Sequence, residues 1–305
     1  MLSYISEWFV CRRGLACGIV NAADSVGGVL FPVVFPPLIA RCGIKNTTRI
    51  YAAALAVCLL PCALFMHPRL PEPRWRAPAQ TAIKRSWIRD RRFWVFIVIN
   101  TLQGFAHYIP LIWLPTFAVS LGRSTSQGSL ALTLSNTAAL PAAFVMGWLS
   151  DRMDIWALAF CVSLLSALAT FTLWGVAAAS YAGILAFGVV YGVTAGTWSS
   201  LWSGFVRPIA KGDPAVAATI INCMMLSRGI GNILSTPIST ALQSVKNDFF
   251  RTANAHAAGL TVDGGRFSAV ILFTGGCFAA GAIVTVVGWV FSGRRCQSTV
   301  DESPQ

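Results

Sequence analysis

Long apolar segments separated by short polar ones run along the whole of this 305-residue chain. A helix needs about 20 apolar residues to cross the hydrocarbon core of a bilayer. Eight segments have about that length, at roughly 14–40, 48–66, 93–118, 129–150, 155–175, 181–204, 216–240 and 267–291. Strands of a membrane barrel are about half as long. The pattern therefore predicts an all-α, polytopic membrane protein with about eight transmembrane helices.

The polar segments between the spans carry basic residues unevenly. If the N-terminus lies in the cytoplasm, the cytoplasmic segments hold 15 Lys and Arg and the opposite loops hold seven, while Arg228 lies inside a span. Cytoplasmic loops are enriched in Lys and Arg. The bias predicts an integral, multi-pass protein with both termini cytoplasmic, in the plasma membrane or an internal one. The longest cytoplasmic segment, 67–92, is Pro-rich and basic, and we expect a linker lying on an anionic membrane face.

Composition supports a bilayer environment and narrows the chemistry. The chain is 55% apolar with a mean hydropathy of +0.65, and only 11% of its residues are charged, against roughly a quarter in soluble domains. The net charge of +12 is explained by Lys and Arg in the loops, and we favour this interpretation over nucleic-acid binding. Most of the nine cysteines lie in apolar runs. We therefore expect no nucleic-acid partner, metal site or cofactor.

A short polar motif, "GWLSDR", follows the fourth span and comprises Gly147 to Arg152. Glycine allows close helix approach, and Asp151 at a helix end can accept hydrogen bonds from backbone N–H groups or from an arginine. Gly147, Asp151 and Arg152 are thus candidates for a conformational latch between two helices. The motif resembles the loop signature of the major facilitator superfamily, with Asp154 where that signature usually has glycine.

The N-terminal stretch "WFVCRRGLACGIVNAADSVGG", residues 8–28, resembles the signature that leads into the fifth helix of monocarboxylate-transporter-like members of that superfamily. The matching residues are Trp8, Phe9, Arg12, Arg13, Leu15, Ala16 and Gly18. Three further stretches resemble the seventh, tenth and eleventh helices of the fungal branch: "GFAHYIPLIWLPTFA", "FGVVYGVTAGTWSSL" and "RGIGNILSTPI". The resemblance implies a secondary transporter that moves a small organic solute by alternating access, embedded in a lipid bilayer.

The resemblance also implies a deficit, because the superfamily has 12 helices in two six-helix halves. The eight spans correspond to helices five to twelve, and the first four are missing. We expect residues 1–66 to be a two-span remnant of the N-terminal bundle, 67–92 the linker, 93–293 a six-helix bundle and 294–305 a cytoplasmic tail. A truncated gene product, a start at an internal methionine, and dimerisation are the open explanations.

Two ionisable residues lie near mid-membrane, where their cost makes them functional candidates. Asp24 lies about 15 Å into its span and Arg228 about 18 Å into another, at 1.5 Å per residue. A direct ion pair is one arrangement. We favour Asp24 facing the span 129–150, where Asn136 could bond to it. The alternatives are a protonated Asp24 bonded to a backbone carbonyl, and Arg228 capping broken backbone near Gly229 and Gly231.

Polar and aromatic residues on shared helix faces complete the candidate solute and proton pathway. Gln103 and His107 are four apart, and His107 could relay a proton or be a structural histidine. Tyr191, Trp198 and Trp202 share a face that could line a solute cavity, the alternative being tryptophan at headgroup depth. A second face on the same span suits tight helix packing. It is formed by Gly188, Gly192 and Gly196.

Two absences limit the substrate and the class of protein. The span 129–150 contains no Lys, Arg, Asp or Glu, although animal monocarboxylate carriers bear a carboxylate-binding arginine there. The solute is therefore monocarboxylate-like or a secondary metabolite to be exported, with proton coupling open. The three histidines do not cluster and no Walker-type loop is present, so we expect neither an enzyme nor an ATP-driven pump. The other hypothesis is a truncated, non-transporting membrane protein or interaction partner.

Overall fold

The computed structural model describes residues 13–65, 85–211, 213–244 and 259–301. Most of the predicted linker, the tip of the predicted tail, and Trp8, Phe9 and Arg12 of the N-terminal signature lie outside the described residues. Within them the chain is helical throughout, and eight helices are long and apolar enough to span a membrane. The predicted all-α fold and the number of spans are confirmed.

The helices follow the predicted spans closely. The long α-helices are α2 (Arg13–Phe65), α3 (Arg91–Ser120), α4 (Thr125–Arg152), α5 (Ile155–Ala169), α6 (Tyr181–Val193), α7 (Trp202–Ala210), α8 (Pro214–Ser244) and α10 (Ser268–Asp301). Shorter helical segments are η1 (Arg85–Arg89), η2 (Thr170–Trp174), η3 (Ala177–Ala179), η4 (Ala195–Leu201) and η5 (Gly259–Gly265). The span predicted at 181–204 consists of α6, η4 and α7 in succession, because 3₁₀ segment η4 interrupts the α-helix.

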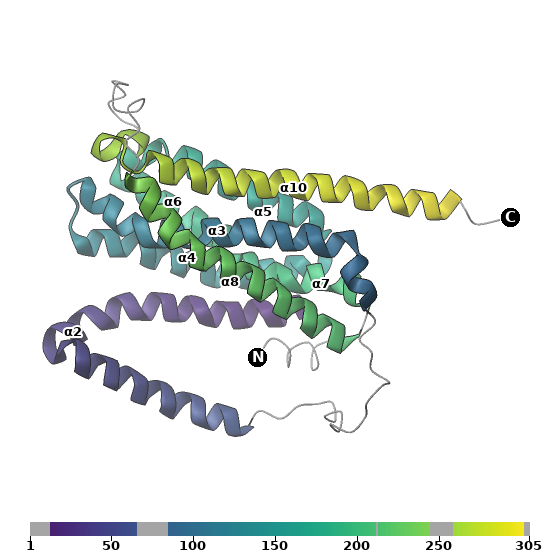
Figure 1. The fold of residues 1–305 in the computed structure, drawn as a ribbon. Coiled ribbons are helices and arrows are strands. Elements are labelled where there is room, and N and C mark those ends of the chain that lie inside the picture. Colours follow the sequence, from purple (N-terminus) through teal and green to yellow (C-terminus); the bar gives the residue numbers. More distant parts are fainter. Residues whose placement is uncertain (1–12, 66–84, 212, 245–258, 302–305) are drawn as a thin grey trace.

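Local sequence explains where several helices begin and turn. Asp90 starts α3 by accepting a hydrogen bond from the backbone N–H of Arg92 at 2.9 Å. Ser124 and Gln127 form a capping box at the start of α4. The first two predicted spans are two arms of α2, which change direction at Gly43, where φ is 74°. That left-handed conformation favours glycine, so a single residue makes the corner between the arms (Figure 1).

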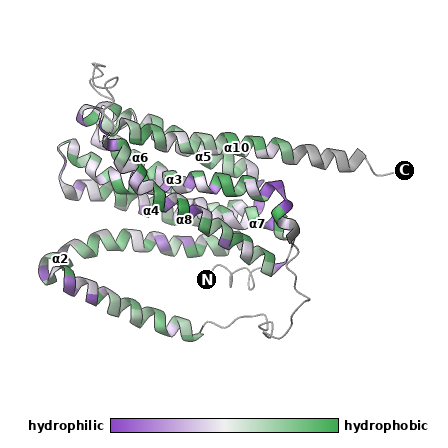
Figure 2. Cartoon of the chain, in the orientation of Figure 1, coloured by the Kyte–Doolittle hydropathy of each residue, from purple (hydrophilic) through white to green (hydrophobic). Residues whose placement is uncertain are grey.

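Helices α3 to α10 form one bundle, and α2 lies along its side (Figure 1). The core of the bundle has two aromatic-rich clusters. The larger fully or nearly fully buried aromatic residues are Phe93, Phe96, Trp156, Trp198 and Phe205 in one cluster, and Phe117, Trp174, Phe187, Phe267 and Phe278 in the other. Most of the helical ribbon is hydrophobic in Figure 2, and many large apolar side chains are exposed. In lipid such surface carries no penalty. The second arm of α2 exposes most of its apolar side chains, so it packs little against the bundle.

Small residues bring α6 and η4 against α4. A Cβ atom at Gly188 would lie 2.7 Å from the carbonyl oxygen of Ala131, and one at Gly192 would lie 2.0 Å from that of Ser135. Both distances are shorter than a Cβ contact can be, so the backbones touch through these glycines. The prediction that the glycine face packs tightly is confirmed, and it fixes the wall formed by α4 and α6.

Candidate functional site

A cavity of about 930 Å³ lies between the two arms of α2 and the helices α3, α4, α6 and α8. Its volume falls in the range of sites for small organic molecules. Five of the seven residues predicted for the solute and proton pathway line this cavity: Asp24, His107, Asn136, Tyr191 and Arg228. The structure thus brings together side chains that are up to 204 positions apart in the sequence.

Arg228 places a cationic group in the cavity wall from α8. The residue is 8% exposed, and within the described ranges its Nη1 atom has no hydrogen-bond partner. The guanidinium carbon lies 5.9 Å from the centre of the Trp202 ring. The helix α8 runs through Gly229 and Gly231 without a break, so Arg228 has no broken backbone to cap. A buried guanidinium with an unused donor beside a cavity is equipped to bind an anionic group.

Asp24 lies on the first arm of α2 and is exposed to the same cavity. Its carboxylate makes neither a hydrogen bond nor an ion pair with any residue in the described ranges. The direct Asp24–Arg228 pair is therefore not formed, and neither is the proposed bond to a backbone carbonyl. The two residues line one cavity, Asp24 from α2 and Arg228 from α8.

Asn136 contacts α2 one helical turn away from Asp24. Its Nδ2 atom donates to the backbone carbonyl of Gly28 at 3.3 Å and to that of Leu132 at 3.1 Å. A Cβ atom at Gly28 would lie 2.5 Å from Oδ1 of Asn136, so glycine is needed for this approach. The expected contact between the first span and 129–150 exists, with the backbone of Gly28 as its partner and not the carboxylate of Asp24.

His107 and Tyr191 form the part of the wall opposite α2. The hydroxyl of Tyr191 donates to the backbone carbonyl of His107, which ties α6 to α3. The two rings are stacked, with centroids 6.4 Å apart. Among the described residues Nδ1 of His107 has no hydrogen-bond partner, and the residue is only partly buried. His107 thus lines the cavity while its unpartnered Nδ1 atom is buried.

Gln103 and Trp198, the other two predicted pathway residues, do not line the cavity. The Nε2 atom of Gln103 donates to Oγ of Ser163 at 3.3 Å inside the bundle. The indole N–H groups of Trp198 and Trp202 both donate to Oδ1 of Asn100 at 3.0 Å. Both tryptophans are buried in the core, so they line neither the cavity, as their shared face suggested, nor a lipid-facing surface.

The sequence reasoning missed Asn100, although an asparagine in an apolar span was a visible signal. Its side chain is fully buried, and its Nδ2 atom donates to the carbonyl of Met224 and to Oγ of Ser227, at 2.6 Å and 2.8 Å. Together with the two tryptophans it joins α3, η4, α7 and α8 directly beside Arg228. All the hydrogen-bonding capacity of one amide is thus used to fix the helix segment that carries the cavity arginine.

The "GWLSDR" motif lies where α4 ends and α2 begins. Oδ2 of Asp151 accepts a hydrogen bond from the backbone N–H of Leu15 at 3.2 Å. Nearby, a Cβ atom at Gly18 would lie 2.5 Å from the carbonyl of Ala143 and 3.4 Å from Cα of Gly147. Arg152 instead stacks over the ring of Trp148, 4.4 Å from its centre. The motif therefore joins two helices through the acid and the glycines.

The described part of the chain contains no candidate metal-binding site. No group of three or more His, Cys, Asp and Glu residues there could hold a metal ion. The cavity is instead lined by apolar and aromatic side chains with a few charged and amide groups. Such a wall suits an organic molecule that carries a polar group.

Curated relatives give this arrangement a context. The chain is 32% identical over 152 residues to MFS-type transporter pytF of Aspergillus terreus. The aligned residues make up 50% of this chain and 51% of the relative. It is 25% identical over 282 residues to aspyridones efflux protein apdF of Emericella nidulans, covering 92% of the chain and 54% of the relative. It is 25% identical over 277 residues to human monocarboxylate transporter 11, covering 87% of the chain and 58% of the relative. The chain thus spans little more than half the length of these relatives.

The names of these relatives point to a transporter rather than an enzyme, and they include both the fungal and the monocarboxylate-transporter branches expected from the sequence motifs. The family model of the major facilitator superfamily matches residues 1–236, which is most of the chain. Together with the eight membrane-spanning helices, this match establishes that the chain belongs to the major facilitator superfamily as an integral, multi-pass membrane protein.

Proposed function

We propose that this protein works in secondary active transport of a small organic solute, with the cavity between α2, α3, α4, α6 and α8 as the solute site. The observation that carries the proposal is Arg228, a largely buried arginine that lines a cavity of about 930 Å³ and whose Nη1 atom has no hydrogen-bond partner among the described residues. The names of the relatives, a monocarboxylate transporter and an efflux protein for an organic metabolite, support the same class of solute.

In this proposal the solute presents an acidic group to Arg228 and its carbon skeleton to the apolar wall. Asp24 faces the same cavity, and it would attract the guanidinium when the solute is absent. A carboxylate exposed to a cavity in a membrane can also take up and release a proton, as His107 can. Coupling of transport to protons through one of these two residues is therefore part of the proposal.

Alternating access would open and close the cavity by moving α2 against the bundle. The Asp151–Leu15 hydrogen bond lies at the end of the α2–α4 contact, where it would hold one of the two states. We further propose that both chain termini lie in the cytoplasm, following the excess of basic residues on that side. Since the matched part makes up only 51–58% of each of these relatives, transport by these residues alone is itself part of what the experiment tests.

Flux into proteoliposomes tests the proposal, with labelled lactate, benzoate and glycerol as probes, each with and without a pH gradient. We expect flux of at least one carboxylate and a loss of about tenfold or more in Arg228→Gln, because a hydrogen bond to a charged group contributes about 1.5–3 kcal/mol. The matched control is Arg49→Gln, an exposed arginine of α2 outside the cavity wall.

Equal flux in Arg228→Gln and the wild type would refute the role of Arg228. Asp24→Asn separates the coupling hypothesis from the binding hypothesis, because it should leave the Arg228 requirement intact. Loss of the response to the pH gradient in this variant would assign the coupling to Asp24, and a response that persists would assign it to His107. Absence of flux for every probe, in protein that still binds a carboxylate, would favour the hypothesis of a non-transporting membrane protein.

A further inference from the structure

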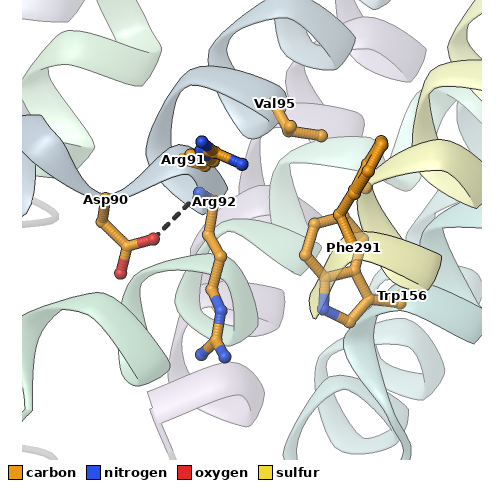
Figure 3. A pocket seen from close by; sticks show the side chains of 7 residues that line it. Asp90, Arg91, Arg92, Val95, Trp156 and Phe291 are labelled. Atoms are coloured by element: carbon orange, nitrogen blue, oxygen red, sulfur yellow. Dashed lines mark hydrogen bonds between the residues drawn. The ribbon is translucent and has the colours of Figure 1, made fainter. Parts of the chain in front are cut away.

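A second, smaller pocket lies at one end of the bundle, away from the central cavity. It has a volume of about 190 Å³ and lies between the start of α3, the start of α5 and the last turns of the α10 span. Figure 3 shows Asp90, Arg91 and Arg92 on one side of it and Trp156 and Phe291 on the other. This volume is below that of sites that enclose a whole small molecule, so the pocket fits part of a larger ligand.

The charged side of the pocket has two arginines without partners. Arg91 is exposed and Arg92 is partly buried, and in the described part of the chain neither guanidinium makes a hydrogen bond or an ion pair. Asp90 also lines the pocket, but it forms no ion pair with either arginine in the described ranges, and its carboxylate accepts the backbone N–H of Arg92 at the start of α3 (Figure 3). The pocket therefore presents two unused cationic groups, and an anionic group would complement them.

The opposite side of the pocket is apolar and rigid. Trp156 is buried and packs against Phe96 with ring centroids 4.6 Å apart, while Phe291 is 58% exposed. A Cβ atom at Gly288 would lie 2.6 Å from both Trp156 and Val95, so glycine lets α10 come against this wall. An apolar chain could continue from the pocket along Phe291 onto the outer surface of the bundle.

All three walls are formed by residues at the ends of membrane-spanning segments. Arg91 begins the span of α3, Trp156 is in the first turn of α5, and Phe291 ends the span of α10. A ligand in the pocket would thus have its polar part at headgroup depth and its apolar part beside the hydrocarbon core. Phospholipids have this distribution of polar and apolar groups.

We propose that this pocket is a binding site for an anionic phospholipid. The phosphate lies between the guanidinium groups of Arg91 and Arg92, and one acyl chain lies against Val95, Trp156 and Phe291. Basic pockets between transmembrane helices suit acidic headgroups, and each arginine near the surface strengthens such binding. The site is separate from the central cavity and does not depend on the proposed transport function.

Native mass spectrometry of the full chain in a non-ionic detergent tests the proposal. The protein is titrated with dioleoyl phosphatidylglycerol, dioleoyl phosphatidylcholine and glycerol 3-phosphate. We expect tighter binding of phosphatidylglycerol than of the other two, and a loss of about fivefold in each of Arg91→Gln and Arg92→Gln. The matched control is Arg89→Gln, which removes an exposed arginine of η1 that does not line the pocket and should leave the affinity unchanged.

Phe291→Ala tests the apolar wall at an exposed position where folding is not at risk. It should weaken binding of phosphatidylglycerol and leave binding of glycerol 3-phosphate as it was. Equal losses in Arg89→Gln and Arg91→Gln would overturn the proposal in favour of diffuse surface charge. Glycerol 3-phosphate binding as tightly as phosphatidylglycerol, with no effect of Phe291→Ala, would overturn it in favour of a site for free phosphate compounds.

Discussion

At the scale of single residues, one buried amide connects the core to the candidate site. Asn100 accepts hydrogen bonds from Trp198 and Trp202 and donates to the backbone of Met224 and to Ser227. Arg228 follows Ser227 directly, so the amide determines the rotation of α8 at the cavity wall. The position of Arg228 at the cavity wall thus depends on an amide that does not itself line the cavity.

Asn100→Leu should lower the stability of the fold. Leucine has a similar volume but leaves two buried indole N–H groups without an acceptor, each at a cost of about 1–3 kcal/mol. We expect a clear fall in Tm of the protein in detergent. The control is Asn136→Leu, which removes one hydrogen bond between helices at the partly exposed cavity wall and should lower Tm less. Similar falls in both variants would contradict this account of Asn100.

At the scale of helices, the contact between α4 and the α6–η4 segment depends on backbone contact through glycine. Gly188 faces the carbonyl group of Ala131, and Gly192 faces that of Ser135. A Cβ atom at Gly196 would lie 3.4 Å from the Cβ atom of Ala139. Small residues on both helices recur every fourth position, so a continuous seam forms along one side of the cavity.

Gly192→Ala should push these helices apart. The added Cβ atom would lie 2.0 Å from the carbonyl oxygen of Ser135, so either helix must move. We expect a lower Tm in detergent, with a loss of more than about 1 kcal/mol from overpacking. Gly276→Ala is the control, because nothing lies within 4 Å of its Cβ position on α10, and alanine favours the helix there by up to about 1 kcal/mol. A Tm at or above the wild type in Gly192→Ala would refute the seam.

The helices show which features the sequence could predict. Span number, span limits and the glycine face follow from apolar length and spacing, which the bilayer imposes on any chain. Trp198 shows what could not be predicted. It was assigned to the Tyr191 face by α-helical spacing, but η4 is a 3₁₀ segment, in which each residue adds about 20° of extra rotation. Trp198 therefore turns into the core, while Tyr191 stays at the cavity wall.

Whether a residue lines the cavity also depends on how the neighbouring helices are rotated and crossed, which sequence spacing does not give. The spacing of Gln103 and His107 places them on one face of α3, yet one bonds to Ser163 inside the bundle and the other lines the cavity. The rotation and crossing angles of the neighbouring helices α5 and α6 decide between these positions. The pairing of Asp151 with a backbone N–H was accessible in advance, because a carboxylate at a helix end has few other partners.

At the scale of the whole molecule, α2 joins the bundle mainly through α4, with smaller contacts to α7 and to η4, where Nδ2 of Asn21 donates to Oγ of Ser200 at 3.2 Å. Close backbone approach at Gly18, the Asn136–Gly28 hydrogen bond and the Asp151–Leu15 hydrogen bond lie along the α2–α4 contact. The central cavity opens between the same two bodies, with Asp24 on one and Arg228 on the other. Movement of α2 about this contact would change the distance between the two charges, so the contact and the candidate site act as one unit. The division into a two-span part, a linker and a six-helix bundle stays a prediction.

Asp151→Asn should loosen the end of this contact. The charged acceptor for the N–H of Leu15 is replaced by a neutral one, and a hydrogen bond to a charged group contributes about 1.5–3 kcal/mol against about 1 kcal/mol for a neutral one. Cys17, buried two residues further along α2, should then react faster with a maleimide, by about threefold or more. Peptide mass spectrometry measures this rate, with the exposed Cys42 as an internal reference. The control is Asp154→Asn, since Asp154 makes no capping hydrogen bond at the start of α5 and should leave the rate unchanged. If both variants accelerate the reaction of Cys17 equally, general loosening of the loop, and not the Asp151–Leu15 bond, would be responsible.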